Sequence, residues 1–103
     1  MMDYHAICAA AVECFGEGHQ IIKAMEELGE LTQALAKWDN GDPVTGDVCE
    51  EIGDVEIMIE QMKIIMGPGY ADYLNRKKAE KMRRLEEIVR GFTFFEKSDA
   101  EAE

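Results

Sequence analysis

The sequence predicts an all-α protein in which four helices form a bundle. Apolar residues recur with the period of an amphipathic helix, and no segment shows the strict alternation of a half-buried strand. Three groups of turn-forming residues, at 16–18, 39–43 and 66–69, divide the chain into four helical stretches. No repeat or internal linker is visible, and 103 residues suit a single domain.

The composition restricts the possible partners and compartment. A formal net charge of -11 disfavours duplex DNA and anionic membranes, because no counterions would be released on contact. The N-terminus lacks a basic leader region, and no segment approaches the roughly 18 apolar residues of a membrane span. The three cysteines are odd in number and lack metal-ligand spacing, so we expect small buried thiols in a reducing compartment. These features predict a soluble, cytoplasmic protein.

The first helix is expected over residues 3–15, with Asp3 near its N-terminal cap. Its modest apolar face consists of Ile7, Ala10, Ala11 and Cys14. His5 and His19 are the only histidines, and neither belongs to a Glu-x-x-His arrangement. We therefore expect both at polar surface positions or helix ends.

The second helix is expected over residues 18–38. One apolar arc should face the core: Ile21, Ala24, Met25, Leu28, Leu31 and Leu35. Glu27 and Glu30 lie beside this arc and are neighbours, because they are three residues apart. Gln20 points the same way as Glu27, whereas Glu26 projects to the far side of Glu30. A solvated acidic face is the alternative interpretation, and it applies best to Glu26.

The third helix, expected over residues 47–66, carries carboxylates on its best apolar face. Asp47 is a candidate N-cap, with Glu50 at the third helical position. The core arc consists of Val48, Val55, Met58, Met62 and Ile65. Glu51 falls in the middle of this arc and Asp54 on its edge. Because an unpaired buried carboxylate is costly, these two acids indicate a bound cation.

The fourth helix is expected over residues 70–90. Its inner face consists of Leu74, Met82, Leu85 and Val89. Lys78 falls in the same stripe and Lys81 beside it, and six of the eleven basic residues lie between Arg76 and Arg84. A lone lysine usually extends its ammonium group to water. Two lysines that point inward, in a protein whose carboxylates also point inward, instead indicate contact with phosphate oxygens.

Two apolar features predict self-association. Ile57 and Ile64 form a second edge of the third helix that one antiparallel partner cannot cover. After the expected domain, residues 1–91, an aromatic segment and an acidic, flexible tail fill residues 92–103. We expect Phe92, Phe94 and Phe95 to dock on a neighbour, and the chain to form a homodimer or a dimer of dimers.

The motifs Glu26-Glu27-Leu28-Gly29-Glu30 and Glu51-Ile52-Gly53-Asp54 resemble the EExxE…ExxD pattern of the MazG-like all-α nucleoside triphosphate pyrophosphohydrolases. A Gly-x-x-x-Gln run before the first motif and Lys81-x-x-Arg84 in the last helix look like the short, single-domain bacterial and phage members. The resemblance covers about residues 12–90. Either half-motif alone is common on helices, whereas both in order at this spacing are specific.

This resemblance implies hydrolysis of a ribo- or deoxynucleoside triphosphate to the monophosphate and pyrophosphate, for nucleotide pool control or house-cleaning. The implied ligands of Mg²⁺, for which Mn²⁺ could substitute, are Glu27, Glu30, Glu51 and Asp54. Such hard oxygen ligands suit a metal that activates water. Glu26, or a ligand carboxylate such as Glu30, would orient that water as general base.

The same resemblance implies how the substrate and a second chain are bound. Lys78, Lys81 and Arg84 would stabilise the charge of the phosphates, and Gln20 would reach the sugar or the base. Helices of two chains would complete the bundle. Gly29 and Gly53, inside the motifs, cost up to about 1 kcal/mol each in a helix, and we expect them to permit close helix approach.

Two other classes of protein are alternative interpretations of this sequence. A di-iron carboxylate bundle needs Glu-x-x-His pairs, which neither histidine supplies. A catalytically degenerate helical dimer that acts as an interaction module is the other alternative. Metal-dependent release of pyrophosphate from mixed nucleotides would separate an enzyme from such a module.

Overall fold

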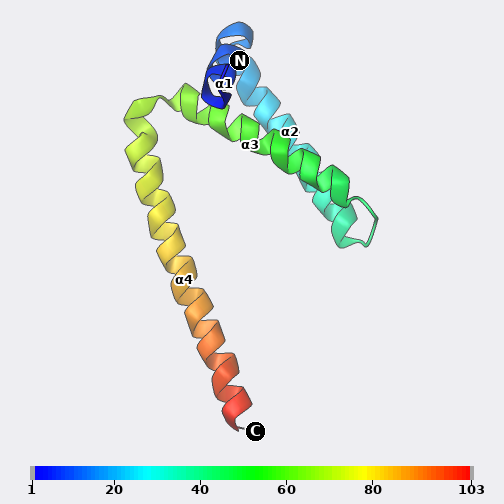
Figure 1. Cartoon of the computed structure of the whole chain (residues 1–103), viewed down its shortest axis with the longest axis vertical. Coiled ribbons are helices and arrows are strands. Elements are labelled where there is room, and N and C mark those ends of the chain that lie inside the picture. Colours follow the sequence, from blue (N-terminus) through cyan, green and yellow to red (C-terminus); the bar gives the residue numbers. More distant parts are fainter. Residues whose placement is uncertain (1, 103) are drawn as a thin grey trace. The chain divides into compact units, whose positions relative to one another are not determined.

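The described residues form four α-helices and one short 3-10 helix, and they contain no strand (Figure 1). The computed structural model describes residues 2–102, with side chains described for residues 2–92. The elements are α1 (Tyr4–Phe15), α2 (Glu17–Asp39), α3 (Thr45–Met66), η1 (Pro68–Tyr70) and α4 (Ala71–Ala102). The all-α prediction with four helices is confirmed.

The helices belong to two compact units, Met1–Pro68 and Gly69–Glu103. In the first unit, α2 and α3 are antiparallel and pack along their length, and α1 lies across the end formed by the start of α2 and the end of α3 (Figure 1). The second unit consists mainly of α4. Among the described residues, no helix combines the length and the apolar character that crossing a bilayer requires.

The helix ends follow local signals, with one correction. Asp3 caps α1, as predicted, by accepting a hydrogen bond of 2.7 Å from the backbone N–H of Ala6. The prediction that Asp47 caps the third helix is wrong, because α3 already begins at Thr45. The turn before it closes tightly, with the Val44 N–H donating to the Asp42 carbonyl at 2.8 Å, and helical bonding starts at once. Asp47 therefore lies in the first turn, where its charge still favours the helix dipole.

The fourth helix extends past its expected end near residue 90 and reaches Ala102. No proline interrupts this stretch, and Gly91 alone does not end a helix. The side chains of Phe94, Phe95 and the acidic tail lie outside the described residues, so the docking and tail predictions are not tested there. The predicted inner face of α4 is largely exposed: Met82, Leu85 and Val89.

The core of the first unit lies between α2 and α3, and α1 adds to it at one end. On α3, Val48, Val55 and Met58 are buried, and Met62 and Ile65 are partly buried, which confirms the predicted core arc. The expected face of α1 is wrong in part: Ala10 and Ala11 are partly buried, but Ile7 and Cys14 are exposed, and Cys8 and Val12 are the buried residues. Of the three free thiols only Cys8 is buried, so the prediction of buried thiols is wrong for Cys14 and Cys49.

Polar bonds fix α1 to α3. The Tyr4 hydroxyl donates to the Glu56 carbonyl at 3.2 Å, and His5 Nδ1 lies 3.0 Å from Glu60 Oε1. His5 and His19 are both exposed, as predicted. The polar bonds of Tyr4 and His5 therefore help the buried residues Cys8 and Val12 to fix the orientation of α1.

The packed face of α2 differs from the predicted one. Its buried residues are Gln20, Ala24, Glu27 and Ala34, and Leu31 is partly buried. The large apolar residues of the predicted arc are exposed: Ile21, Met25, Leu28 and Leu35. Small alanines and polar residues face α3, and the bulky side chains form a neighbouring surface. We call Ile21, Met25, Leu28 and Leu35 the α2 apolar arc.

The two motif glycines do not contact another helix within the described chain. A Cβ atom built at Gly29 or at Gly53 would meet no heavy atom within 4 Å outside its own helix backbone. The expectation that they permit close helix approach is therefore not met by α1, α2 or α3. On α3, Ile57 is exposed and Ile64 partly buried, so the second apolar edge is only partly covered.

Candidate metal centre

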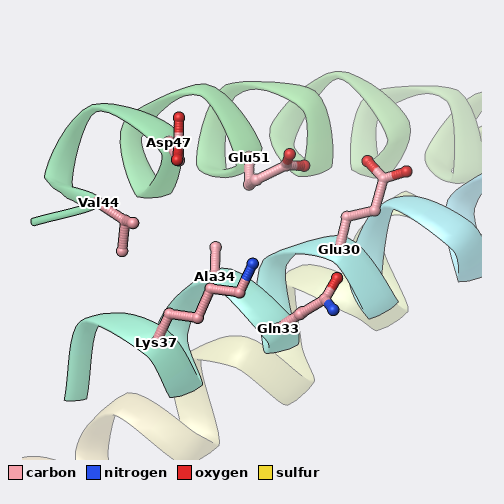
Figure 2. A pocket seen from close by; sticks show the side chains of 7 residues that line it. All are labelled: Glu30, Gln33, Ala34, Lys37, Val44, Asp47 and Glu51. Atoms are coloured by element: carbon pink, nitrogen blue, oxygen red, sulfur yellow. The ribbon is translucent and has the colours of Figure 1, made fainter. Parts of the chain in front are cut away.

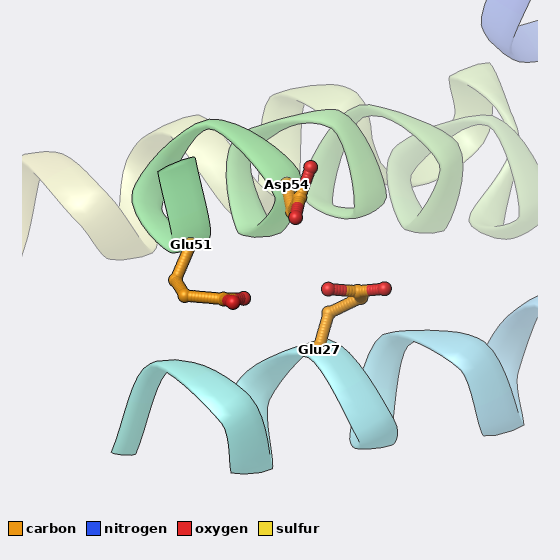
Figure 3. A group of neighbouring side chains, drawn as sticks. All are labelled: Glu27, Glu51 and Asp54. Carbon is orange, nitrogen blue, oxygen red and sulfur yellow. The ribbon is translucent and has the colours of Figure 1, made fainter. Parts of the chain in front are cut away.

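Three acidic side chains converge between α2 and α3. Glu27 projects from α2 towards Glu51 and Asp54, which lie one turn apart on α3 (Figure 3). One carboxylate oxygen from each lies within 4.8 Å of the others. The i,i+3 spacing on α3 and the antiparallel packing of α2 produce this convergence. We call Glu27, Glu51 and Asp54 the carboxylate triad.

Burial makes the negative charges of the triad energetically unfavourable. Glu27 is only 8% exposed, Glu51 is partly buried, and Asp54 lies at the exposed edge. Oε2 of Glu27 and Oε2 of Glu51 are buried without a hydrogen-bond partner among the described residues. Leaving such oxygens unpaired costs free energy that a cation would recover. Hard carboxylate oxygens from two facing helices fit Mg²⁺ or Mn²⁺.

The pKa of Glu51 reflects the same unfavourable burial of negative charge. Burial raises the pKa of this carboxyl group above its ordinary value of 4.5. Neighbouring carboxylates raise the pKa further: Glu30, Asp54 and Glu27. Both causes disfavour a negative charge at Glu51, and a bound cation would counteract both.

The structure brings together three of the four predicted metal ligands. Glu30 is exposed on α2, close enough to Glu51 to raise its pKa, but it is not one of the converging three. Glu26 is exposed on the outer flank of α2, where its Oε2 lies 4.0 Å from Lys23 Nζ. Both predicted proton acceptors are therefore reachable by water.

Sequence reasoning missed Lys23. Its Nζ lies 3.2 Å from Oε1 of Glu27, and this hydrogen bond is the main cause that raises the pKa of Lys23. The i,i+4 spacing of lysine and glutamate could have indicated the pair. The triad thus has one neighbouring ammonium group, which is itself 46% exposed.

Gln20 lies in the packed face of α2, and its amide group has partners there. Gln20 is 5% exposed, and its Nε2 donates to Oε1 of buried Gln61 at 2.7 Å. Its Oε1 lies 2.7 Å from His19 Nδ1. The sequence analysis had not singled out Gln61. The bond to Gln61 joins α2 to α3, whereas the contact with His19 lies within α2. The predicted contact of Gln20 with sugar or base is not tested and stays a prediction.

A groove of about 390 Å³ begins at the triad and extends towards the loop between α2 and α3 (Figure 2). Glu51 belongs to both the triad and the groove, and Glu30 lies on the opposite wall. The remaining lining residues are Gln33, Ala34, Lys37, Val44 and Asp47. The groove was not predicted, because its walls combine residues that share no sequence motif.

The predicted phosphate-binding residues lie on α4, in the second unit. Lys78, Lys81 and Arg84 are exposed, and none forms an ion pair with a side chain among residues 2–92. Lys77 differs, because it pairs with Glu80 at 3.5 Å and its Nζ lies 5.4 Å from the centre of the Tyr73 ring. The three predicted residues are thus available to an anion.

No protein-family model, curated protein or solved structure matches this chain.

Proposed function

We propose that the chain is a Mg²⁺-dependent nucleoside triphosphate pyrophosphohydrolase of the MazG-like type. It would convert a ribo- or deoxynucleoside triphosphate to the monophosphate and pyrophosphate. The observation that carries the proposal is the carboxylate triad, with two buried oxygens that lack partners. The motif pattern of the sequence adds the reaction class, because the three residues fall at the ligand positions of both motifs.

Each acidic residue has a role that its position supports. Glu27, Glu51 and Asp54 would hold the ion, since their oxygens already converge. When bound, Mg²⁺ neutralises phosphate charge and lowers the pKa of a coordinated water. Glu30 is placed to complete the ligand set or to accept a proton, because it is exposed and lines the groove beside Glu51.

The bond changes require one proton acceptor and one leaving group. A water oxygen forms a bond to phosphorus, the phosphoanhydride P–O bond breaks, and pyrophosphate leaves with the bonding electrons. The proton of the attacking water passes to a carboxylate. Glu30 suits this role better than Glu26, because Glu26 lies on the outer flank next to Lys23.

Positive charge for the phosphates would come from Lys78, Lys81 and Arg84 of α4. Their lack of ion pairs within residues 2–92 supports this assignment, because no protein carboxylate there competes with a phosphate. Phosphate recognition by basic side chains is a charge-assisted interaction, stronger than a neutral hydrogen bond.

The proposal includes assembly into a homodimer or a dimer of dimers, with helices of two chains completing the bundle. The exposed α2 apolar arc supports it, as do the exposed apolar residues of α4. Large apolar residues exposed in such number are typical of interfaces. A second chain would cover residues that the helices of one unit leave in water.

The test is Mg²⁺-dependent release of pyrophosphate from a mixture of ribo- and deoxynucleoside triphosphates. Wild type should release pyrophosphate only with the metal, and Glu51→Gln should abolish release while retaining helix content. Glu56→Gln is the matched control, because Glu56 is exposed on the same helix outside the triad. Retained turnover in Glu51→Gln would refute the metal site. No release by wild type would favour the interaction module.

A further inference from the structure

The groove between α2 and α3 adjoins the carboxylate triad at Glu51. Glu51 contributes to both features, and Glu30 faces it across the groove mouth (Figure 2). A ligand whose phosphates reach the triad would therefore extend one end along this groove. Its volume of about 390 Å³ falls within the usual range for small-molecule sites, roughly 300–1,000 Å³.

The charges of the lining decide which part of a nucleotide the groove accepts. Three carboxylates line it, Glu30, Asp47 and Glu51, against one ammonium group, that of Lys37. This excess of negative charge repels phosphate oxygens that are not neutralised by metal. Carboxylates accept hydrogen bonds from neutral donors, such as the hydroxyl groups of a sugar and the amino group of a base.

The lining of the groove leaves room for a small, uncharged occupant. Ala34 is buried and presents only a methyl group towards α3, which leaves room above it (Figure 2). Val44 adds apolar surface at the loop end. Lys37 and Asp47 lie on opposite walls of this end, one a donor and the other an acceptor. Most of the lining residues are polar, and they suit the hydroxyl groups of a sugar and the polar edge of a base.

We propose that this groove binds the nucleoside half of the substrate, and that Asp47 and Lys37 recognise its polar edges. The phosphates lie at the triad and the base points towards the loop between α2 and α3. The proposal rests on the proposed function and names residues outside both sequence motifs. Asp47 and Lys37 are specificity residues, because they contact the nucleoside and not the reacting phosphorus.

The test compares the binding of two ligands by calorimetry with Mg²⁺ present: a nucleoside triphosphate and inorganic tripolyphosphate, which lacks the nucleoside. Asp47→Asn and Lys37→Met should each weaken binding of the nucleotide by about tenfold, the effect of losing one charged hydrogen bond. Binding of tripolyphosphate should not weaken. Ala34→Leu, which fills the groove, should act like the charge variants. Helix content and Mn²⁺ affinity report whether the fold and the triad are intact.

Glu56→Gln and Lys63→Met are the matched controls, because both residues are exposed on α3 and neither lines the groove. Equal weakening for both ligands, or unchanged nucleotide binding in all three groove variants, would overturn the proposal. Hydrolysis rates distinguish failure of the groove proposal from failure of the proposed function. If wild type hydrolyses nucleotides and the groove variants bind them normally, only the groove assignment fails. If wild type binds nucleotide through the groove without hydrolysis, only the reaction fails.

Discussion

The ammonium nitrogen of Lys23 lies 3.2 Å from Oε1 of Glu27, the most buried carboxylate of the triad. Both residues belong to α2 and are one turn apart. The pair leaves Oε2 of Glu27 without a partner among the described residues. In the metal-free protein, Lys23 is therefore a partial counter-ion, and it competes with any metal for the same carboxylate.

Removing this ammonium group should strengthen metal binding. Lys23→Met eliminates both the competing hydrogen bond and the repulsion between an ammonium group and a divalent cation. Because Lys23 is nearly half exposed, water screens the effect, and we expect Mn²⁺ affinity to rise by up to about fivefold. Calorimetric titration measures the change, with Lys63→Met as control. Weaker Mn²⁺ binding in Lys23→Met would contradict the competition.

The raised pKa of Glu51 predicts how the stability of the metal-free protein depends on pH. The folded state retains the Glu51 proton at pH values where the unfolded state, with a pKa near 4.5, has lost it. The free energy of unfolding should therefore fall as pH rises from 4.5 through the raised pKa. Glu51→Gln should remove this part of the decline and stabilise the metal-free protein above that range. Thermal unfolding in chelator tests it, and a Glu51→Gln curve parallel to wild type would be contrary evidence.

The α2 apolar arc should be part of the interface between two chains. Leu28→Glu places a charge in the middle of the arc and should shift the protein towards the monomer mass of 11.6 kDa. Ile22→Glu is a matched control, because Ile22 is comparably exposed on α2 but lies outside the arc. Light scattering at micromolar concentration gives the mass. A wild-type protein that is monomeric, or equal effects of the two variants, would argue against this interface.

The basic residues of α4 should matter for turnover and not for folding. A Lys78→Met, Lys81→Met double variant removes two exposed ammonium groups that have no ion pair within residues 2–92. It should lower kcat, raise KM for the nucleotide, or both, with the thermal midpoint unchanged. Lys77→Met is the control, since Lys77 is occupied by Glu80. Unchanged kinetics in the double variant would leave the metal as the source of positive charge.

Thiol reactivity should separate the three cysteines. Cys14 and Cys49 are exposed and should react with a disulfide reagent in the native protein. Burial, and secondarily the charge of Glu60, raise the pKa of the Cys8 thiol, so little reactive thiolate forms at neutral pH. Cys8 should react only after denaturation. Titration in buffer and in guanidinium checks this, and labelling of Cys8 at the rate of Cys14 would contradict the packing of α1.

The core face of α3 could be predicted from the sequence because its apolar residues recur with the period of a helix. Val48, Val55 and Met58 are buried as periodicity indicates, and Glu51 lies among them. A carboxylate within such an arc is an informative exception to the pattern, since it predicts both burial and a cation. The triad was therefore largely predictable from residue types and spacing.

The packed face of α2 could not be predicted in the same way. The pattern of apolar residues predicts which surface of a helix is buried, but not which neighbouring element buries it. In α2 the bulkiest residues, such as Leu28 and Met25, lie beside the face that contacts α3, and Ala24 and Ala34 form that contact. The hydrogen bond between Gln20 and Gln61 depends on which residues of two helices face each other, and so does the groove. The periodicity of one helix does not give this information.

If the carboxylate triad binds a cation as proposed, the folding of the helix pair is linked to the surrounding ions, because buried oxygens of Glu27 and Glu51 lack partners among the described residues. An ion that binds only the folded state at one hundred times its Kd adds about 2.7 kcal/mol to the free energy of unfolding. Such an increment is a large share of the stability of a small domain. The folded fraction would then follow the free concentration of divalent cations, so that a chelator acts on the chain as a mild denaturant.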